Sequence, residues 1–223
     1  AMCNQGAVHP LAASLEGVRE ACTRTGTILI FDEVITGFRL APGGAQELFG
    51  VTPDLSTFGK AIANGFPVAA IAGRADLMDM FTSGGVVHGG TYNAQPIAMA
   101  ATAATLKSLT PALYKKIGVS GTALQEGFKE IFASAGVTAS VVGFPQVFHV
   151  ALGLDKPARD FRDLAKMNRP AYIALTTALM YRGVRALERG AWFLSSEHDA
   201  GVINDTLDAM RDAVRELKAK GTI

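Results

Sequence analysis

Two hydrophobic periods follow one another near the start of the chain. Residues 11–24 place apolar side chains three and four positions apart with charged residues between them, which predicts an amphipathic helix. Residues 27–31 (TILIF) are a short, unbroken apolar run rich in β-branched residues, which predicts a strand buried on both faces. Asp32 and Glu33 follow at its carboxyl end. This order is typical of an α/β sheet, in which ligands lie at the carboxyl ends of strands.

Short elements separated by glycine and proline continue to about residue 110. We expect helices at 45–49, 75–81 and 94–109, strands at 54–58 and 68–72, and a glycine-rich loop at 83–91. The strand at 54–58 leads directly into Gly59 and Lys60. A lysine and an acid therefore follow two neighbouring predicted strands.

Beyond Pro111 the pattern changes to longer helices around a few strands. We expect helices at 112–135, 161–182 and 199–218, two β segments within 137–150, and a strand at 191–195. The sequence thus predicts an α/β domain at residues 1–110 and a smaller α+β domain at residues 111–223, with the boundary near Thr110.

Composition favours a globular protein with a small-molecule site. Hydrophobic residues make up 49% of the 223 residues and charged residues 18%, and the net charge of +1 gives no surplus for binding nucleic acid or a membrane. The uncharged stretch at 89–106 contains Asn, Gln and Pro, which suit a membrane span poorly. The two cysteines and four histidines show no metal-ligand spacing, so we expect no metal site. No secretory signal opens the chain, so we expect the cytoplasm.

Lys60 and Asp32 carry the candidate chemistry. Alone, Lys60 fits a surface lysine, and Asp32 fits a structural role, as a helix cap or an ion-pair partner, as well as it fits a role in a site. Together they suit a pyridine-aldehyde cofactor: a carboxylate keeps the ring nitrogen protonated, so that the ring accepts electrons, and a lysine holds the aldehyde carbon. The turn at Gly90 and Thr91 precedes a helix and could contact a phosphate, although a plain turn or cap is the simpler interpretation.

Three segments resemble signatures of the class III aminotransferase family. These are FDEVITGFR at 31–39, DLSTFGK at 54–60 and GGTYNAQP at 89–96, and the resemblance spans essentially the whole chain. The members that it most resembles are glutamate-1-semialdehyde 2,1-aminomutase and related aminotransferases. The resemblance implies a fold-type I pyridoxal-phosphate (PLP) transferase. Residues 1–110 would then be part of the aspartate aminotransferase-like large domain and residues 111–223 the small C-terminal domain.

The resemblance also implies roles for single residues. Lys60 would form the Schiff base with pyridoxal 5'-phosphate and move the proton at the substrate α-carbon. Asp32 would pair with the ring nitrogen, and Val34 would pack against one face of the ring. Asn4 would lie near the phenolic oxygen.

By the same resemblance, Gly90 and Thr91 would bind the phosphate of a neighbouring subunit's cofactor, which implies a homodimer with a shared active site. Glu33 and Arg39 belong to the first motif, and we interpret both as scaffold. Two departures are mild: Ala63-Asn64-Gly65 replaces a run of three glycines, and Gln95 replaces the usual asparagine.

The function predicted from this resemblance is transfer of an amino group from a small-molecule donor to a keto acid or aldehyde. Aminomutase chemistry on glutamate-1-semialdehyde is the alternative. Interpretations from other classes are a non-catalytic dimerisation module and a nucleotide-binding α/β protein. The upstream phosphate loop and ring-stacking aromatic of the family have no counterpart here. We therefore expect the chain to be part of a longer parent, and alone to bind the cofactor weakly and turn over poorly.

Overall fold

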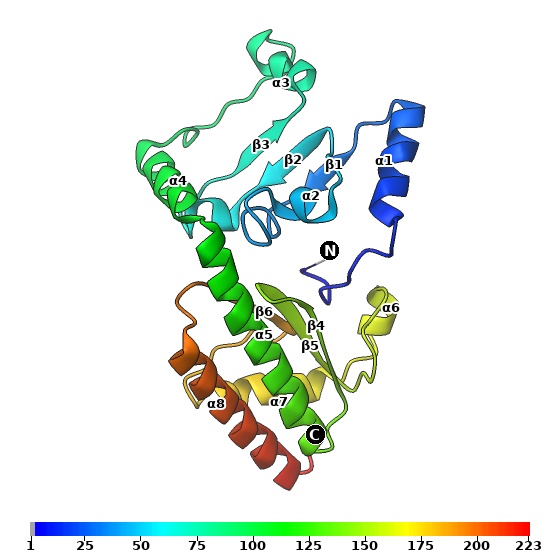
Figure 1. The fold of residues 1–223 in the computed structure, drawn as a ribbon, viewed down its shortest axis with the longest axis vertical. Coiled ribbons are helices and arrows are strands. Elements are labelled where there is room, and N and C mark those ends of the chain that lie inside the picture. Colours follow the sequence, from blue (N-terminus) through cyan, green and yellow to red (C-terminus); the bar gives the residue numbers. More distant parts are fainter. Residues whose placement is uncertain (1–2) are drawn as a thin grey trace. The chain divides into compact units, whose positions relative to one another are not determined.

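The computed structural model describes residues 3–223, which divide into two compact units. Pro10–Pro111 form the first unit; Ala112–Ile223 form the second, together with the N-terminal residues up to His9. The first unit holds a mixed sheet and the second an antiparallel sheet (Figure 1). Along the chain the two units meet between Pro111 and Ala112, and residues 3–9 group with the second unit.

The first unit is a three-stranded sheet with short helices. Its elements are α1 (Ser14–Thr25), β1 (Ile30–Asp32), α2 (Gly44–Phe49), β2 (Leu55–Phe58), the 3-10 helix η1 (Lys60–Ala63), β3 (Ala70–Gly73), α3 (Ala75–Thr82) and α4 (Pro96–Ser108). The strand order is β1-β2-β3, with β1 and β2 parallel and β3 antiparallel to β2. The parallel register places Asp32 beside Thr57. The carboxyl ends of β1 and β2 therefore lie side by side.

The first strand differs from its prediction in length and burial. It was expected at 27–31 with both faces buried, but it spans Ile30–Asp32, and the Ile30 side chain is 56% exposed. An apolar run shows only that a segment favours burial, whereas actual burial depends on a layer that covers each face of the sheet. Within residues 3–223, no such layer covers Ile30.

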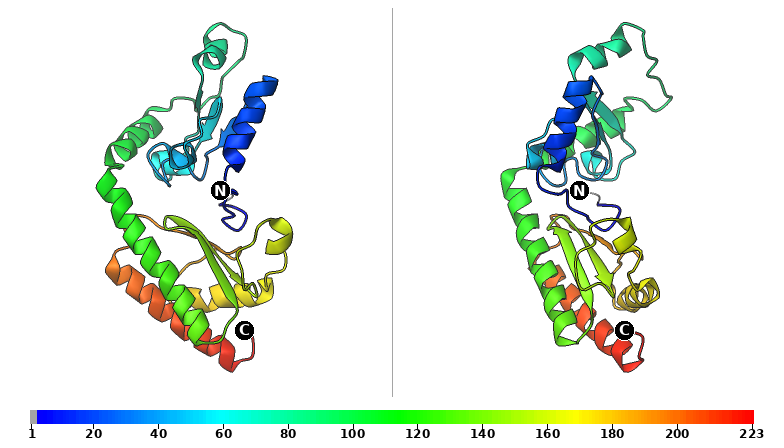
Figure 2. Two further views of the ribbon diagram at one scale, coloured as in Figure 1. Left: turned by 45° about the vertical axis from the view of Figure 1, so that its right-hand side comes forward. Right: turned by 90° about the vertical axis from the view of Figure 1, so that its right-hand side faces the viewer.

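The second unit packs long helices against a three-stranded antiparallel sheet of order β4-β5-β6. Its elements are α5 (Pro111–Ser134), β4 (Ala139–Phe144), β5 (Val147–Leu152), α6 (Phe161–Leu164), α7 (Arg169–Met180), β6 (Ala191–Phe193) and α8 (Ala200–Ala219). The two views in Figure 2 show α5 and α8 running side by side along this unit. The β4–β5 hairpin turns at Pro145, within the segment where two β segments were predicted.

The central strand β5 is buried on both faces. Phe148 belongs to the main core, in which the Trp192 ring stacks on it with centroids 6.1 Å apart. Ala151 lies in a smaller cluster with Val8 of the N-terminal segment. The N-terminal segment thus helps, through Val8, to cover the side of the sheet that the long helices leave open.

The helix predicted at 161–182 is two helices. α6 ends at Leu164, and α7 begins only at Arg169. The Asn168 side chain accepts a hydrogen bond from the backbone N–H of Ala171 at 3.1 Å, and Pro170 occupies the first turn of α7. Proline lacks the N–H that a helix interior needs and is tolerated in the first turn, so the chain restarts the helix here.

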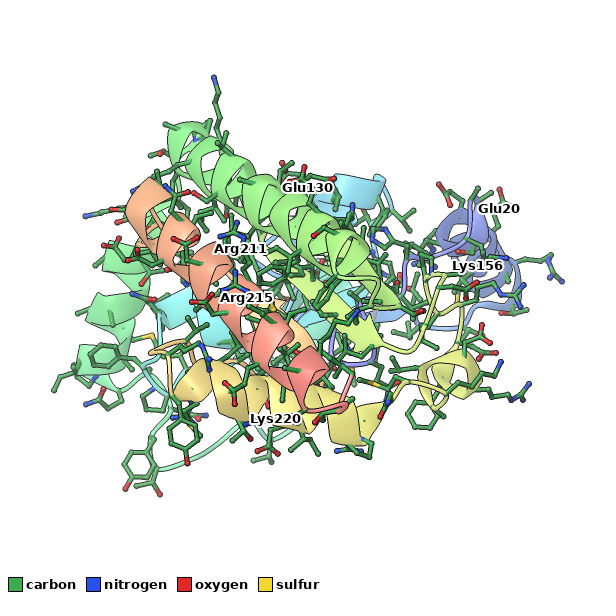
Figure 3. All side chains as sticks on the ribbon, turned by 90° about the horizontal axis from the view of Figure 1, so that it is seen from below. Glu20, Glu130, Lys156, Arg211, Arg215 and Lys220 are labelled. Atoms are coloured by element: carbon green, nitrogen blue, oxygen red, sulfur yellow. The ribbon has the colours of Figure 1, made fainter. Side chains whose placement is uncertain are left out.

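The closing helix α8 is amphipathic, as its sequence predicts. Met210 and Val214 are buried four residues apart, whereas the residues that directly follow them, Arg211 and Arg215 (both labelled in Figure 3), are exposed. Arg215 pairs with Asp212 one turn earlier at 3.2 Å. Among residues 3–223, no helix combines the length and the apolar character needed to cross a membrane.

Replacing Tyr172 with Phe is predicted to destabilise the second unit by about 1–3 kcal/mol, because it removes the acceptor of a buried N–H. Trp192 Nε1 donates to the Tyr172 hydroxyl at 3.0 Å, and both side chains are buried. Urea unfolding followed by tryptophan fluorescence measures the change. Tyr181→Phe, at the 86% exposed C-cap position directly after α7, is the matched control and should stay within about 0.5 kcal/mol of wild type. Equal stability of the two variants would contradict the prediction.

Candidate active site

The candidate active site lies at the carboxyl ends of β1 and β2. Asp32 is the last residue of β1, and Lys60 follows the end of β2 by two residues. Asp32 is in register with Thr57 of β2, and Lys60 follows Thr57 by three residues. Neighbouring strands lie about 4.8 Å apart. The carboxylate and the amine therefore emerge from the same edge of the sheet.

Asp32 is exposed, and its carboxylate keeps one oxygen available. Oδ1 accepts a hydrogen bond from the backbone N–H of Val34 at 3.0 Å, which orients the group. In the described part of the chain, Oδ2 makes no hydrogen bond or ion pair. Asp32 thus presents a fixed, unused acceptor.

Lys60 has a backbone conformation that is uncommon for a residue with a side chain. Its φ is +48°, in the left-handed region, and it opens η1 directly after the extended Gly59. Such a conformation costs on the order of 1 kcal/mol and is found often at functional sites. Lys60 is exposed, and its amine contacts no acid or acceptor among residues 3–223. The amine is therefore available for chemistry.

Val34 connects the two strand ends. A Cβ at Gly59 would lie 3.4 Å from Val34 Cγ1, so the Val34 side chain packs beside the backbone that leads into Lys60. Gly37, in the same turn, allows another close approach, because a Cβ there would lie 2.6 Å from the Phe58 ring. The segment after β1 therefore lies against the end of β2.

Glu33 points away from this edge and is almost completely buried, with 1% of it exposed. Its carboxylate accepts hydrogen bonds from the backbone N–H groups of Ala45 at 2.8 Å and Gln46 at 2.9 Å, in the first turn of α2, and from the Thr36 hydroxyl. A Cβ at Gly44 would lie 2.6 Å from this carboxylate, so only glycine fits there. These contacts agree with the scaffold interpretation of Glu33.

Asp54 lies at the amino end of β2. It opens the motif DLSTFGK, but no separate role was predicted for it. Its buried carboxylate accepts the Leu29 backbone N–H at 2.8 Å and pairs with Arg19 of α1 at 2.8 Å and Arg74 at 2.9 Å. The Leu29 hydrogen bond first, then those from Arg74 and Arg19, hold the pKa of Asp54 well below its usual range. One carboxylate thus joins α1, the segment before β1, β2 and the start of α3. The burial of Asp54 is the feature that reveals this role, and it cannot be seen in the sequence.

Gly90 and Thr91 lie in an exposed turn before α4. The turn closes with a hydrogen bond from the Asn93 N–H to the Gly90 carbonyl at 3.0 Å. Gln95 caps α4 by accepting the Ala98 N–H at 2.7 Å, so the glutamine in place of asparagine keeps a capping acceptor. Asn64, the other departure, has φ +47°, which asparagine tolerates well. α4 itself packs against η1, the helix that begins at Lys60.

Asn4 belongs to the second unit, where it is exposed in a turn near the N-terminus. The structure therefore brings together Asp32, Val34 and the segment of Lys60. Gly90 and Thr91 lie in a separate turn of the same unit, and Asn4 lies outside that unit.

Comparison with known proteins places these motifs in one family. The family model for aminotransferase class III matches residues 2–191. The chain belongs to the class III aminotransferase family. Over 225 residues it is 40% identical to the glutamate-1-semialdehyde 2,1-aminomutase of Desulfatibacillum aliphaticivorans, covering 96% of this chain and 51% of that protein. The class III chain thus spans about half the length of the curated relatives that it matches.

Solved structures show the same fold. An omega-transaminase from Sphaerobacter thermophilus is 33% identical, with a TM-score of 0.87 over 94% of this chain and 49% of that one. The FumI protein of Sphingopyxis sp. MTA144, solved in its PLP internal aldimine form, is 26% identical, with a TM-score of 0.80 over 92% and 47%. This class III chain therefore has the α/β fold of the PLP-dependent transaminases, over half of their length.

Asp54→Asn is predicted to lower the melting temperature of the first unit at neutral pH and to remove part of its acid sensitivity. In the wild type, the pKa of Asp54 is lower in the folded than in the unfolded state. The stabilisation that the ionised carboxylate gives is therefore complete above the unfolded-state pKa of about 3.9, and it is lost as the pH falls toward the folded-state pKa. The difference between wild type and variant should therefore shrink below about pH 4. Melting curves from pH 7 to pH 2 measure this.

Asp76→Asn is the matched control, because Asp76 also pairs with Arg74 but is 61% exposed. It should melt close to wild type at every pH. If Asp54→Asn and Asp76→Asn have the same effect, the Asp54 network does not support this unit.

Proposed function

We propose that this chain carries the cofactor lysine of a PLP-dependent enzyme that moves an amino group from a small-molecule donor to a keto acid or aldehyde acceptor. The observation that carries the proposal is the placement of Asp32 and Lys60 at adjacent carboxyl ends of parallel strands, each with a polar group that has no partner among residues 3–223. Membership of the class III family supports it.

The donor set suits this cofactor. A pyridinium N–H needs an anionic acceptor, and Asp32 Oδ2 is available while its partner oxygen is held by Val34. An aldehyde needs an amine, and Lys60 provides one. Pyridoxal phosphate, when bound, supplies an aldehyde that condenses with amines and a ring that accepts the electron pair left at the α-carbon. Under this proposal Val34 packs against one ring face, and Asn4 lies near the phenolic oxygen.

Each residue then has a separate task in the reaction. The Asp32 carboxylate keeps the ring nitrogen protonated through a charge-assisted hydrogen bond. Lys60 Nζ would hold the cofactor at rest; once a substrate amine has taken its place, the lysine amine would accept the proton of the substrate α-carbon and return it during amino transfer. The left-handed backbone of Lys60 holds this side chain at the sheet edge for both tasks.

The remaining assignments belong to the same proposal. Gly90 and Thr91 bind the phosphate of a neighbouring subunit's cofactor, and the enzyme works as a cytoplasmic homodimer. The exposure of their turn leaves its backbone accessible to a partner. Residues 1–110 contribute to the large cofactor domain, and residues 111–223 form the small one.

Aminomutase activity on glutamate-1-semialdehyde is the second candidate, because the 40% identical relative from Desulfatibacillum aliphaticivorans bears that name. Product analysis separates the candidates: an aminomutase returns the amino group to the neighbouring carbon of one substrate, whereas a transaminase releases a keto product and aminates an acceptor. A non-catalytic dimerisation module would give neither product.

Borohydride reduction in the presence of excess pyridoxal phosphate is predicted to label Lys60 in preference to every other lysine. Peptide mass mapping locates the label. Lys107 of α4, also exposed and in the same unit, is the internal control, and Lys60→Arg should abolish the preferred label without changing labelling at Lys107. Labelling spread evenly over exposed lysines would sink the proposal.

Asp32→Asn is predicted to slow amino transfer roughly 10- to 150-fold, because a charge-assisted hydrogen bond of ~1.5–3 kcal/mol is lost. Labelling of Lys60 should persist, since the amine is untouched. Single-turnover conversion of a bound amine, followed by absorbance, gives the rate. Asp79→Asn, on the exposed surface of α3, is the control with the same chemical change. An unchanged rate in Asp32→Asn would remove Asp32 from the site.

A further inference from the structure

Asp32, the last residue of β1, and the two residues that follow it have three different surroundings. Asp32 keeps an unused carboxylate oxygen at the sheet edge, Val34 packs beside Gly59, and Glu33 between them turns into the interior. Glu33 lies between Asp32 and Val34 where β1 passes into a turn, so the contacts that hold Glu33 also limit where the backbone on either side of it can lie.

The backbone of Glu33 joins the two strand ends. Its N–H donates to the carbonyl of Thr57 at 2.9 Å, one step beyond the last paired residue of β1. Thr57 is three residues before Lys60. This hydrogen bond therefore continues the parallel ladder to the point where Asp32 and the lysine segment are presented.

The side chain of Glu33 anchors the same point to α2. It accepts two backbone N–H groups of the first turn of α2, one of them part-buried, and the buried Thr36 hydroxyl. Burying the Glu33 carboxylate without these donors would be strongly unfavourable. The residues after β1 are therefore held in the position in which Glu33 keeps all three hydrogen bonds. Gly44, at φ +73°, is the residue that makes room for it.

We propose that Glu33 is a positioning residue of the PLP site: its buried carboxylate, held by the α2 amides, sets the orientation of Asp32 and Val34 toward the cofactor ring. This inference rests on the proposed function. Glu33 itself touches neither the ring nor the substrate. It acts through the Asp32–Val34 turn, whose hydrogen bond orients the carboxylate that receives the ring nitrogen.

The first test uses the chain without cofactor. In Glu33→Gln, an amide NH₂ replaces one acceptor and faces backbone donors. Hydrogen exchange of the Val34 amide, the donor to Asp32, should become about tenfold faster or more. Glu47→Gln is the matched control: Glu47 lies on the exposed face of α2, accepts the Gly43 N–H and not the donors of Glu33, and should leave the exchange of Val34 unchanged.

A second pair of variants approaches the contact from the other side and serves if Glu33→Gln does not fold. Gly44→Ala places a methyl group against the Glu33 carboxylate, whereas Gly50→Ala, at φ +66° in the C-cap of the same helix, meets open space. Both carry left-handed backbone strain, but only Gly44→Ala should speed exchange at Val34. Equal exchange in the two alanine variants would overturn the inference.

The cofactor arm measures the pyridoxal phosphate concentration that gives half-maximal borohydride labelling of Lys60. Glu33→Gln should raise it several-fold in protein that remains folded, while the maximal label stays on Lys60. A folded Glu33→Gln chain with wild-type Val34 exchange and wild-type half-saturation would overturn the inference and leave the proposed function standing. No preferred Lys60 label in wild type would count against the proposed function, and the exchange arm alone would then decide the role of Glu33.

Discussion

The parallel pairing of β1 with β2 is the constraint on which the candidate site depends. It places Asp32 beside Thr57 and so brings an acid and a lysine, far apart in sequence, to one sheet edge. Parallel strands end at the same edge, and a short β1 of three residues must be held in register by contacts outside the ladder. A shift of one residue would turn the Asp32 side chain to the opposite face.

Two buried carboxylates supply those contacts from opposite ends. Asp54 holds the amino end of β2 to Leu29, α1 and Arg74. Glu33 holds the carboxyl end of β1 to Thr57 and α2. Both acids have their charge compensated by backbone N–H groups, hydroxyls or guanidinium groups, which is the condition for burying a carboxylate. The strands that carry the exposed side chains of Asp32 and Lys60 are thus held in place by buried polar groups that all have hydrogen-bond partners.

Motif spacing and turn chemistry predicted most of the elements and the family, because these signals are local. The helix at 199–218, the hairpin around Pro145 and the strand before Lys60 all lie within a few residues of their predicted positions. The sequence also contains a signal for the helix break at Asn168, because an asparagine that can cap a helix precedes Pro170. The apolar periodicity continues across this break and favoured a single helix.

Other features could not be read from the sequence. The exposure of Ile30 depends on which layers cover the sheet, and the role of Asp54 depends on Arg19 and Arg74, which are distant in sequence. The left-handed backbone conformation of Lys60 cannot be predicted from the residue type. The proposed site residues Asn4, Gly90 and Thr91 still rest on the resemblance.

The central claim is that one cofactor ring joins Asp32 and Lys60. A crystal structure of the chain after reduction with pyridoxal phosphate tests it directly. The account predicts a ring bonded to Lys60 Nζ, with its nitrogen within about 3.2 Å of an Asp32 carboxylate oxygen and one face against Val34. A ring on Lys60 whose nitrogen points away from Asp32 toward solvent would contradict the account.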